Sequence, residues 1–257
     1  MHDEVADSLL AIPGVGAVRT GFMEYTEPSI ATQLKAFDAA GIERVIVIPL
    51  LLTISDHSFD DIPAICGLVD DPELIARLGS EGIEVYSPAA RLEVSPLLDF
   101  SGLVQRNTVR RVSEMIGDPT DLADASHGLV LVGYGSAEFN DDWDRFFISI
   151  REHVERELGI AASAHAWCGH LVNYSRQPTT SAIESMLERT ERVIVVPILV
   201  AYDPMFQDKI IGRAVERCVS PERILYRPDS ILPEPEVGSW VVDIARQLAA
   251  TTVDAAT

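Results

Sequence analysis

Two stretches of the chain have nearly the same sequence: ERVIVIPLLLTISDHSFDDI at residues 43–62 and ERVIVVPILVAYDPMFQDKI at residues 191–210. They align without a gap, and the prolines at 49 and 197 match. Upstream, EYTEPSIATQL (24–34) parallels NYSRQPTTSAI (173–183), with one residue added before the second proline. Copies so far apart predict a duplicated lobe, because solenoid repeats have much shorter periods.

Each copy alternates strand-like and helix-like segments. The long apolar, β-branched run RVIVVPILV is typical of a strand covered on both faces. In the second lobe the pattern predicts strands at 129–136, 161–169, 192–200 and 223–228, with helices at 143–159, 179–190, 207–219 and 237–249. This alternation predicts an α/β protein of two duplicated lobes, each with a doubly wound parallel sheet.

The first lobe has one strand fewer in this pattern. Strands are expected at 16–23, 44–52 and 82–88, followed by a closing helix at 101–117 and a linker at 117–128. The strand LVLVGYGS (129–136) has no counterpart, because Met1 falls inside the expected first helix. The predicted lobes are residues 1–120 and 129–250, and the first is expected to lack its first strand.

The strand LVLVGYGS ends in Gly133-Tyr134-Gly135-Ser136. Open α/β sheets place ligands outside the carboxyl ends of their strands. The third glycine of a dinucleotide fingerprint is missing, and so is the Gly-x-Ser-x-Gly frame of a nucleophile elbow. We therefore expect a ligand site at this strand end, but no nucleotide cofactor.

Composition limits the partners. The 257 residues have a net charge of −20, which argues against binding to nucleic acid or an anionic membrane surface. No apolar run reaches the roughly 18 residues that a membrane span needs, and the acidic start MHDEVADSLL is unlike a signal peptide, so a cytoplasmic protein is expected. Three scattered cysteines argue against a disulfide framework or a zinc motif. The oligomeric state stays open, a homo-oligomer included.

Several motifs carry a resemblance to a known family. The duplicated lobe, the strand ending in Gly-x-Gly-Ser, the Pro-Ser or Pro-Thr helix start and the run RVIVIPLLLTISDHSFDDIP (44–63) together resemble the class II tetrapyrrole chelatases. The similarity is strongest to CbiX-type sirohydrochlorin chelatases and more distant to ferrochelatase. It implies a chelatase-like fold and insertion of Co²⁺ or Fe²⁺, as substrate, into a small-molecule tetrapyrrole without ATP.

The resemblance also implies site residues. The family has histidine in Gly-His-Gly-Ser and a second histidine after the PLLL strand; His57 matches the second, whereas Tyr134 stands where the first is expected. Neutral imidazole binds borderline metals and titrates near neutrality, so His57 is the leading metal ligand and base. Its neighbours Asp56, Asp60 and Asp61 suit a carboxylate-assisted site, although an exposed loop histidine among solubilising acids is the simpler reading.

In the second lobe the residue matching His57 is Met205, and other histidines follow the strand at 161–169. His170, just past that strand, is a further candidate for catalysis and metal binding. His165 and Cys168 lie within the strand and are expected to pack in the core. Tyr134 has a reference pKa of about 10 and is no base near neutral pH. It could contact the macrocycle, bind ferric iron as phenolate, or merely cap the sheet edge.

Cationic and polar residues near the same strand ends are candidates for substrate binding through the carboxylates of a tetrapyrrole. They are Ser136, Arg176, Tyr202, Lys209 and Arg213.

Two functions remain open. The first is ATP-independent insertion of Co²⁺ or Fe²⁺ into sirohydrochlorin or a related tetrapyrrole. The second is a chelatase-like protein without insertion activity that binds a tetrapyrrole or a metal as carrier or sensor, which the tyrosine at 134 favours. An unrelated reaction on the same fold is the remaining alternative.

Overall fold

The computed structural model describes the chain except residues 1, 25, 54, 99–101, 118–125 and 251–257, so most of the expected linker lies outside the described part. The chain forms two compact units. Unit 1 comprises Met1–Leu98 and Pro235–Thr257, and unit 2 comprises Asp99–Glu234. In the part of the chain that is described, no helix is both long and apolar enough to cross a membrane.

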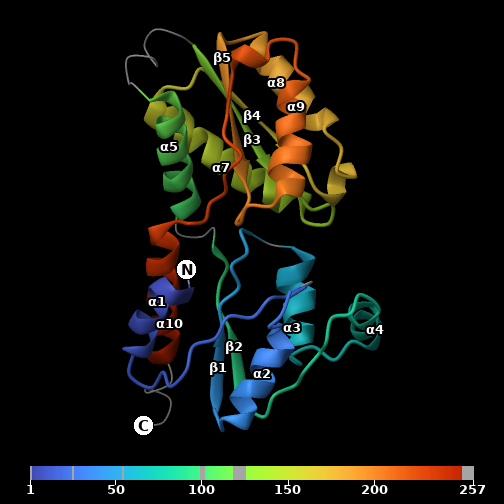
Figure 1. The fold of residues 1–257 in the computed structure, drawn as a ribbon, viewed down its shortest axis with the longest axis vertical. Coiled ribbons are helices and arrows are strands. Elements are labelled where there is room, and N and C mark those ends of the chain that lie inside the picture. The colour runs from blue at the N-terminus through green and yellow to red at the C-terminus, as the bar shows by residue number, and fades with distance from the viewer. Residues whose placement is uncertain (1, 25, 54, 99–101, 118–125, 251–257) are drawn as a thin grey trace. The chain divides into compact units, whose positions relative to one another are not determined.

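Unit 2 contains a four-stranded parallel sheet in the order β4-β3-β5-β6. The strands are β3 (His127–Gly133), β4 (Ala162–Trp167), β5 (Arg192–Ile198) and β6 (Ile224–Tyr226). Helices α5 (Leu103–Ile116) and α7 (Asn140–Leu158) cover one face, while α8 (Gln177–Leu187) and α9 (Arg213–Glu216) cover the other (Figure 1). All four predicted strands of this lobe are confirmed, and so is the doubly wound arrangement.

The strand end Gly133-Tyr134-Gly135-Ser136 needs its two glycines for different reasons. Every residue of β3 is buried, and a Cβ at Gly133 would lie 2.3 Å from Cζ of Phe147. Gly135 has φ +80°, in the left-handed region that side chains other than glycine rarely adopt. The first glycine therefore lets α7 approach the sheet, and the second turns the chain out of the strand just after Tyr134.

Unit 1 has a two-stranded parallel sheet, in which β1 (Arg44–Val47) pairs with β2 (Arg91–Val94). Around it lie α1 (His2–Leu10), α2 (Ile30–Ala39), α3 (Ile62–Ile65) and α4 (Pro72–Ser80). The chain begins its described part with helix α1, and within the described residues no strand takes the place that β3 has in unit 2. The prediction that the first lobe lacks its first strand is confirmed.

The predicted strand at 16–23 is wrong. Those residues belong to no strand and form only one isolated bridge, between Phe22 and Ser29. The matching strand in unit 2 is β4, which pairs only with β3. Because unit 1 has no strand equivalent to β3 among its described residues, the segment at 16–23 has no ladder partner.

The predicted strand at 82–88 is also misplaced. Its backbone does not pair with β1; instead, the amide of Tyr86 donates to the carbonyl of Ile65, at the end of α3, at 2.9 Å. The true partner of β1 is the more polar segment Arg91–Val94, where Glu93 accepts from Arg44 at 2.5 Å. Charged residues alternate with apolar ones in this strand, so it lacks the continuous apolar run from which strands were predicted.

The repeat is confirmed by matching elements. Strands β1 and β5 begin at Arg44 and Arg192, which are aligned residues. After a loop, each copy forms a π-helical segment: η1 (His57–Asp61) and η4 (Met205–Gly212). These segments also begin at aligned positions, so the two copies share strand, loop and helix in register.

The two units differ from the predicted bounds of 1–120 and 129–250, because the last helix of each predicted lobe belongs to the other unit. Helix α5 was expected to close the first lobe but packs on α7 and β5 in unit 2. Helix α10 (Pro235–Ala250) was expected in the second lobe but packs on α1 in unit 1. Val241 and Ala245 of α10 form an apolar cluster with Val5, Leu9 and Ile12. Helical periodicity marks the buried face of a helix but not the unit that covers it.

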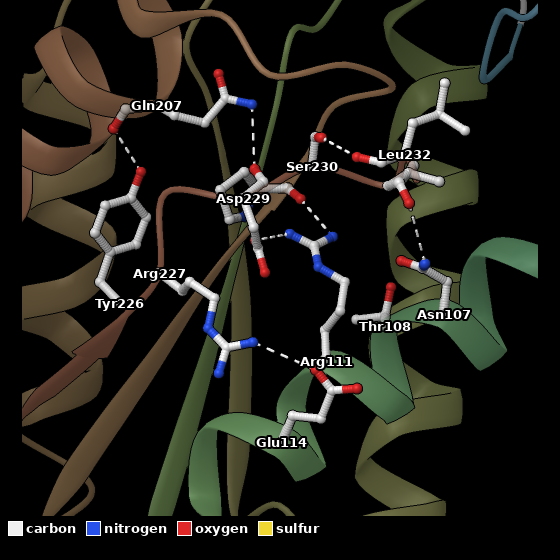
Figure 2. A network of polar contacts seen from close by, with 12 residues as sticks. Asn107, Thr108, Arg111, Glu114, Gln207, Tyr226, Arg227, Asp229, Ser230 and Leu232 are labelled. Carbon is white, nitrogen blue, oxygen red and sulfur yellow. Dashed lines mark hydrogen bonds and ion pairs between the residues drawn. The ribbon is translucent and has the colours of Figure 1, made fainter. Parts of the chain in front are cut away.

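A buried arginine holds α5 to the rest of unit 2 (Figure 2). Arg111 is 2% exposed; its guanidinium donates to the carbonyl of Pro197 at 2.8 Å and pairs with Asp229. Gln207, also buried, donates to the carbonyl of Asp229 at 3.2 Å. The loop after β6 is thus bonded both to α5 and to η4.

Candidate functional site

His57 opens η1 in the loop region that follows β1. Its side chain is 42% exposed, and Nδ1 lies 2.7 Å from Oδ2 of Asp61. Residues four apart are neighbours on a helical surface, which brings the two side chains together. The histidine therefore has one ring nitrogen engaged by a carboxylate and a partly exposed ring.

Asp61 is a buried carboxylate with two cationic or donor partners. It is 1% exposed, and its other oxygen pairs with Arg77 of α4. An ionised carboxylate only accepts hydrogen bonds, so Nδ1 of a neutral His57 must carry the proton. Nε2 then keeps its lone pair, which is the arrangement that metal-binding histidines use to fix ring orientation.

The surrounding acids favour the protonated form of His57. The hydrogen bond to Asp61 raises the pKa of His57 above its ordinary value, burial opposes this, and the charges of Glu24 and Asp56 add to the rise. Burial alone would raise the pKa of Asp61, but hydrogen bonds from His57 and Arg77 outweigh it and lower that pKa. The pair can therefore accept a proton readily and stabilise a positive charge.

Asp61→Asn should lower the pKa of His57, measured by NMR titration of the imidazole ring. A raised pKa in the folded protein means that protonated His57 contributes stability fully below the unfolded value of 6.5. That contribution is lost as the pH rises through the folded pKa, so the variant should also show a flatter dependence of unfolding free energy on pH above 6.5. Asp60→Asn, in the exposed neighbour, is the control. An unchanged His57 midpoint in Asp61→Asn would contradict the assignment.

Unit 2 brings four aromatic side chains together at the carboxyl ends of its strands. This aromatic cluster consists of Tyr134, His170, Tyr174 and Phe206. The ring of Tyr134 lies 5.6 Å from that of His170 and 5.5 Å from that of Phe206, edge to face in both cases. The hydroxyl of Tyr174 lies 2.9 Å and 3.0 Å from the ring nitrogens of His170 and 3.5 Å from the hydroxyl of Tyr134.

Three neighbouring strands supply this cluster. Tyr134 follows β3, Phe206 belongs to η4 after β5, and the 3₁₀ turn η3 (His170–Val172) with Tyr174 follows β4. Asn173 and Tyr174 have φ of 49° and 56°, both left-handed without being glycine. Such backbone costs energy and persists where the surroundings impose it. The predicted candidates Tyr134 and His170 are thus neighbours, and Tyr174 joins them.

Cys168 packs in the core, as predicted, whereas His165 is only partly buried and is held by hydrogen bonds to α7. Nε2 of His165 lies 2.9 Å from Asp144 and Nδ1 lies 3.1 Å from Arg151, both on α7. Burial lowers the pKa of His165. Cys168 is fully buried in the core, and burial raises the pKa of its thiol to about 12. All three cysteines of the chain are free and buried.

Two of the predicted substrate-binding cations are joined. Nε of Arg176 donates to the backbone carbonyl of Lys209 at 2.7 Å, which links the start of α8 to η4. Arg213 lies one turn beyond Lys209, and both side chains are exposed. The remaining candidates have local partners. Ser136 accepts from the amide of Phe139 at 3.3 Å, ahead of α7.

Tyr202 belongs to different surroundings from the aromatic cluster. Its hydroxyl donates to Asp208 at 2.6 Å, and this bond raises its pKa. It lines a cavity of about 300 Å³ together with Arg111 and Asp229.

The two predicted metal ligands, His57 and His170, belong to different units. No three His, Cys, Asp or Glu side chains gather into a metal-binding group in the described residues. Sequence reasoning missed the specific roles of Asp61 and Arg77, the charge of Glu24 near His57, and the tyrosine at 174. The spacing of four between His57 and Asp61 was the one visible signal.

Comparisons with known proteins place these residues in a family. A family model described as CbiX matches residues 3–115. The sirohydrochlorin cobaltochelatase of Saccharolobus solfataricus is 30% identical over 97 residues, which are 38% of this chain and 70% of that protein. The chain belongs to the CbiX family. The sirohydrochlorin cobaltochelatase of Methanocaldococcus jannaschii is 39% identical over 54 residues, 21% of this chain and 38% of that protein.

Solved structures extend the likeness to the CbiX fold over nearly the whole chain. SirB from Bacillus subtilis with Fe³⁺ has a TM-score of 0.66 at 20% identity, covering 98% of this chain and 90% of that one. CbiX, described as the terminal enzyme for biosynthesis of siroheme in denitrifying bacteria, has a TM-score of 0.58 at 15% identity, covering 95% and 89%. The predicted chelatase-like α/β fold is confirmed. At these identities the structures show the fold alone.

Proposed function

We propose that this member of the CbiX family inserts a divalent metal, Co²⁺ or Fe²⁺, into sirohydrochlorin or a related tetrapyrrole without ATP. The observation that carries the proposal is the chain of contacts from the partly exposed His57 through buried Asp61 to Arg77. Family membership supports the reaction class, since the relatives are named sirohydrochlorin cobaltochelatases. A cytoplasmic location belongs to the same proposal, consistent with three free cysteines.

Metal insertion exchanges two pyrrole N–H protons for one divalent ion. In the proposed mechanism Nε2 of His57 holds the incoming ion, because Asp61 keeps the proton on Nδ1. Once the ion has passed to the macrocycle, the freed Nε2 takes up one of the two pyrrole protons and solvent water takes the other. Asp61 and Glu24 stabilise the positive charge at His57 in both states. One loosely held ion suits a substrate that must be released into the macrocycle.

The carrier or sensor function is a second candidate, and Tyr134 favours it. Where the family resemblance leads one to expect a histidine, this chain has a phenol that contacts Tyr174 and two other rings. A phenol with an ordinary pKa near 10 takes up no proton at neutral pH. In this second function the aromatic cluster binds the tetrapyrrole or the metal without insertion, and His170 supplies an exposed imidazole.

The test is incubation of the purified protein with sirohydrochlorin and Co²⁺ or Fe²⁺, with the visible spectrum followed against a control without protein. Insertion predicts conversion to the metallated spectrum at a rate proportional to protein concentration. A shifted spectrum that saturates at one equivalent of protein, with no turnover, would favour the carrier function instead.

A further inference from the structure

The two repeats carry opposite charges at matched positions. Asp61 of unit 1 aligns without a gap with Lys209 of unit 2. When the upstream stretches are aligned from their first residues, Glu27 corresponds to Arg176. Asp61 is buried beside His57, whereas Lys209 is exposed, and its backbone carbonyl binds Arg176. The position that holds the carboxylate of Asp61, which stabilises a cation, in unit 1 is therefore occupied by the cationic Lys209 in unit 2.

Three cations of unit 2 form no ion pair within the described part of the chain. Lys35, the other lysine, pairs with Glu84 at 2.5 Å. Among the described residues, Arg176, Lys209 and Arg213 have no carboxylate within 4.0 Å, a property that they share with Arg189, Arg192 and Arg217. A chain with 40 acidic and 20 basic residues offers carboxylates widely. Three neighbouring cations that use none of them are suited to binding anions from outside the chain.

Two of these cations, Arg176 and Lys209, follow members of the aromatic cluster closely in the sequence. Phe206 of η4 contacts the rings of Tyr134 and Tyr174, and Lys209 follows it by three residues. Arg176 follows Tyr174 by two residues and is bonded to Lys209. Aromatic rings next to cationic side chains match a ligand with a flat conjugated ring and carboxylates on its periphery.

We propose that unit 2 is the recognition unit for the macrocycle: the aromatic cluster contacts its ring face, and Arg176, Lys209 and Arg213 bind its peripheral carboxylates. The inference rests on the proposed function and deepens it, since it assigns macrocycle recognition to one repeat and the metal ion to the other. The duplicated positions then diverged in charge because they came to bind substrates of opposite charge.

The experiment measures binding of metal-free uroporphyrin, a planar octacarboxylate, by quenching of its fluorescence with the full-length protein. Lys209→Glu and Arg213→Glu should each weaken binding about tenfold, because each replaces an attraction by a repulsion. Wild-type affinity should fall as salt is raised, since exposed charge pairs are screened. Arg189→Glu, an equally exposed charge reversal after α8 in the same unit, is the matched control and should bind like wild type.

Unchanged affinity in the Lys209→Glu/Arg213→Glu double variant, or an equal loss in Arg189→Glu, would overturn the inference. If wild type binds uroporphyrin through Lys209 yet inserts no metal, the inference stands and the proposed insertion fails. If metal is inserted and the charge reversals leave KM for sirohydrochlorin unchanged, the inference fails and the proposed function stands.

Discussion

Replacing His57 with alanine should lower the rate of Co²⁺ insertion by about 100-fold or more while leaving the fold intact. The side chain is 42% exposed, so its loss removes little packing. It would nevertheless remove both the metal ligand and the proton acceptor, and general base catalysis alone is worth about 10²–10⁴-fold. The rate is measured at saturating sirohydrochlorin and limiting Co²⁺, with circular dichroism as the test of folding.

His153→Ala supplies the control for this variant. His153 is also partly exposed, but it lies on α7 of unit 2, where its Nδ1 is 3.0 Å from Arg156. It should insert metal at the wild-type rate. Equal rates in His57→Ala and wild type would remove His57 from the mechanism and favour the carrier function.

Asp229→Ala should destabilise the protein by about 3 kcal/mol, because it leaves the guanidinium of Arg111 buried without its carboxylate. For a chain of this size, that loss corresponds to a fall in melting temperature of about 6–12 °C. Arg111→Met should cost less than Asp229→Ala, since it removes the buried charge together with the need to compensate it. Thermal unfolding followed by circular dichroism measures both.

A surface ion pair gives the matched control for this stability test. Asp243 pairs with Arg246 at 2.9 Å, and their side chains are 62% and 61% exposed. Asp243→Ala should change the melting temperature hardly at all, because exposed pairs contribute little. If Arg111→Met proved more damaging than Asp229→Ala, hydrogen bonding to the carbonyl of Pro197 would outweigh the buried charge.

The sequence predicted elements whose signal is local. β3 and β5 are covered on both faces, so they appear as continuous apolar runs. The segment at 16–23 was predicted as a strand from the repeat pattern but is not one, because pairing depends on a neighbour that unit 1 lacks within its described residues. A strand forms only where a neighbouring strand offers hydrogen-bond partners, and the sequence of one segment does not show whether such a neighbour exists.

In the candidate site, too, only the residues that are close in sequence could be predicted. His57 stood out from the repeat and the family resemblance, and Asp61 lies four residues away. Arg77, by contrast, belongs to another helix, and Tyr174 reaches Tyr134 only because two strand ends are adjacent in the sheet. Contacts made across the fold leave no periodic trace in the sequence.

The exchange of closing helices has a consequence for the order of folding during synthesis. Chains emerge from the ribosome N-terminus first, and early domains usually fold before later ones. Here unit 2 is complete at Glu234, whereas unit 1 needs α10 to cover Val5 and Leu9 and to offer the carbonyl of Leu248 to Arg44. The half of the protein that is made first must therefore wait for the last helix, and the half made second can finish ahead of it. A chain truncated before residue 235 should show a protease-resistant unit 2 and a protease-sensitive unit 1.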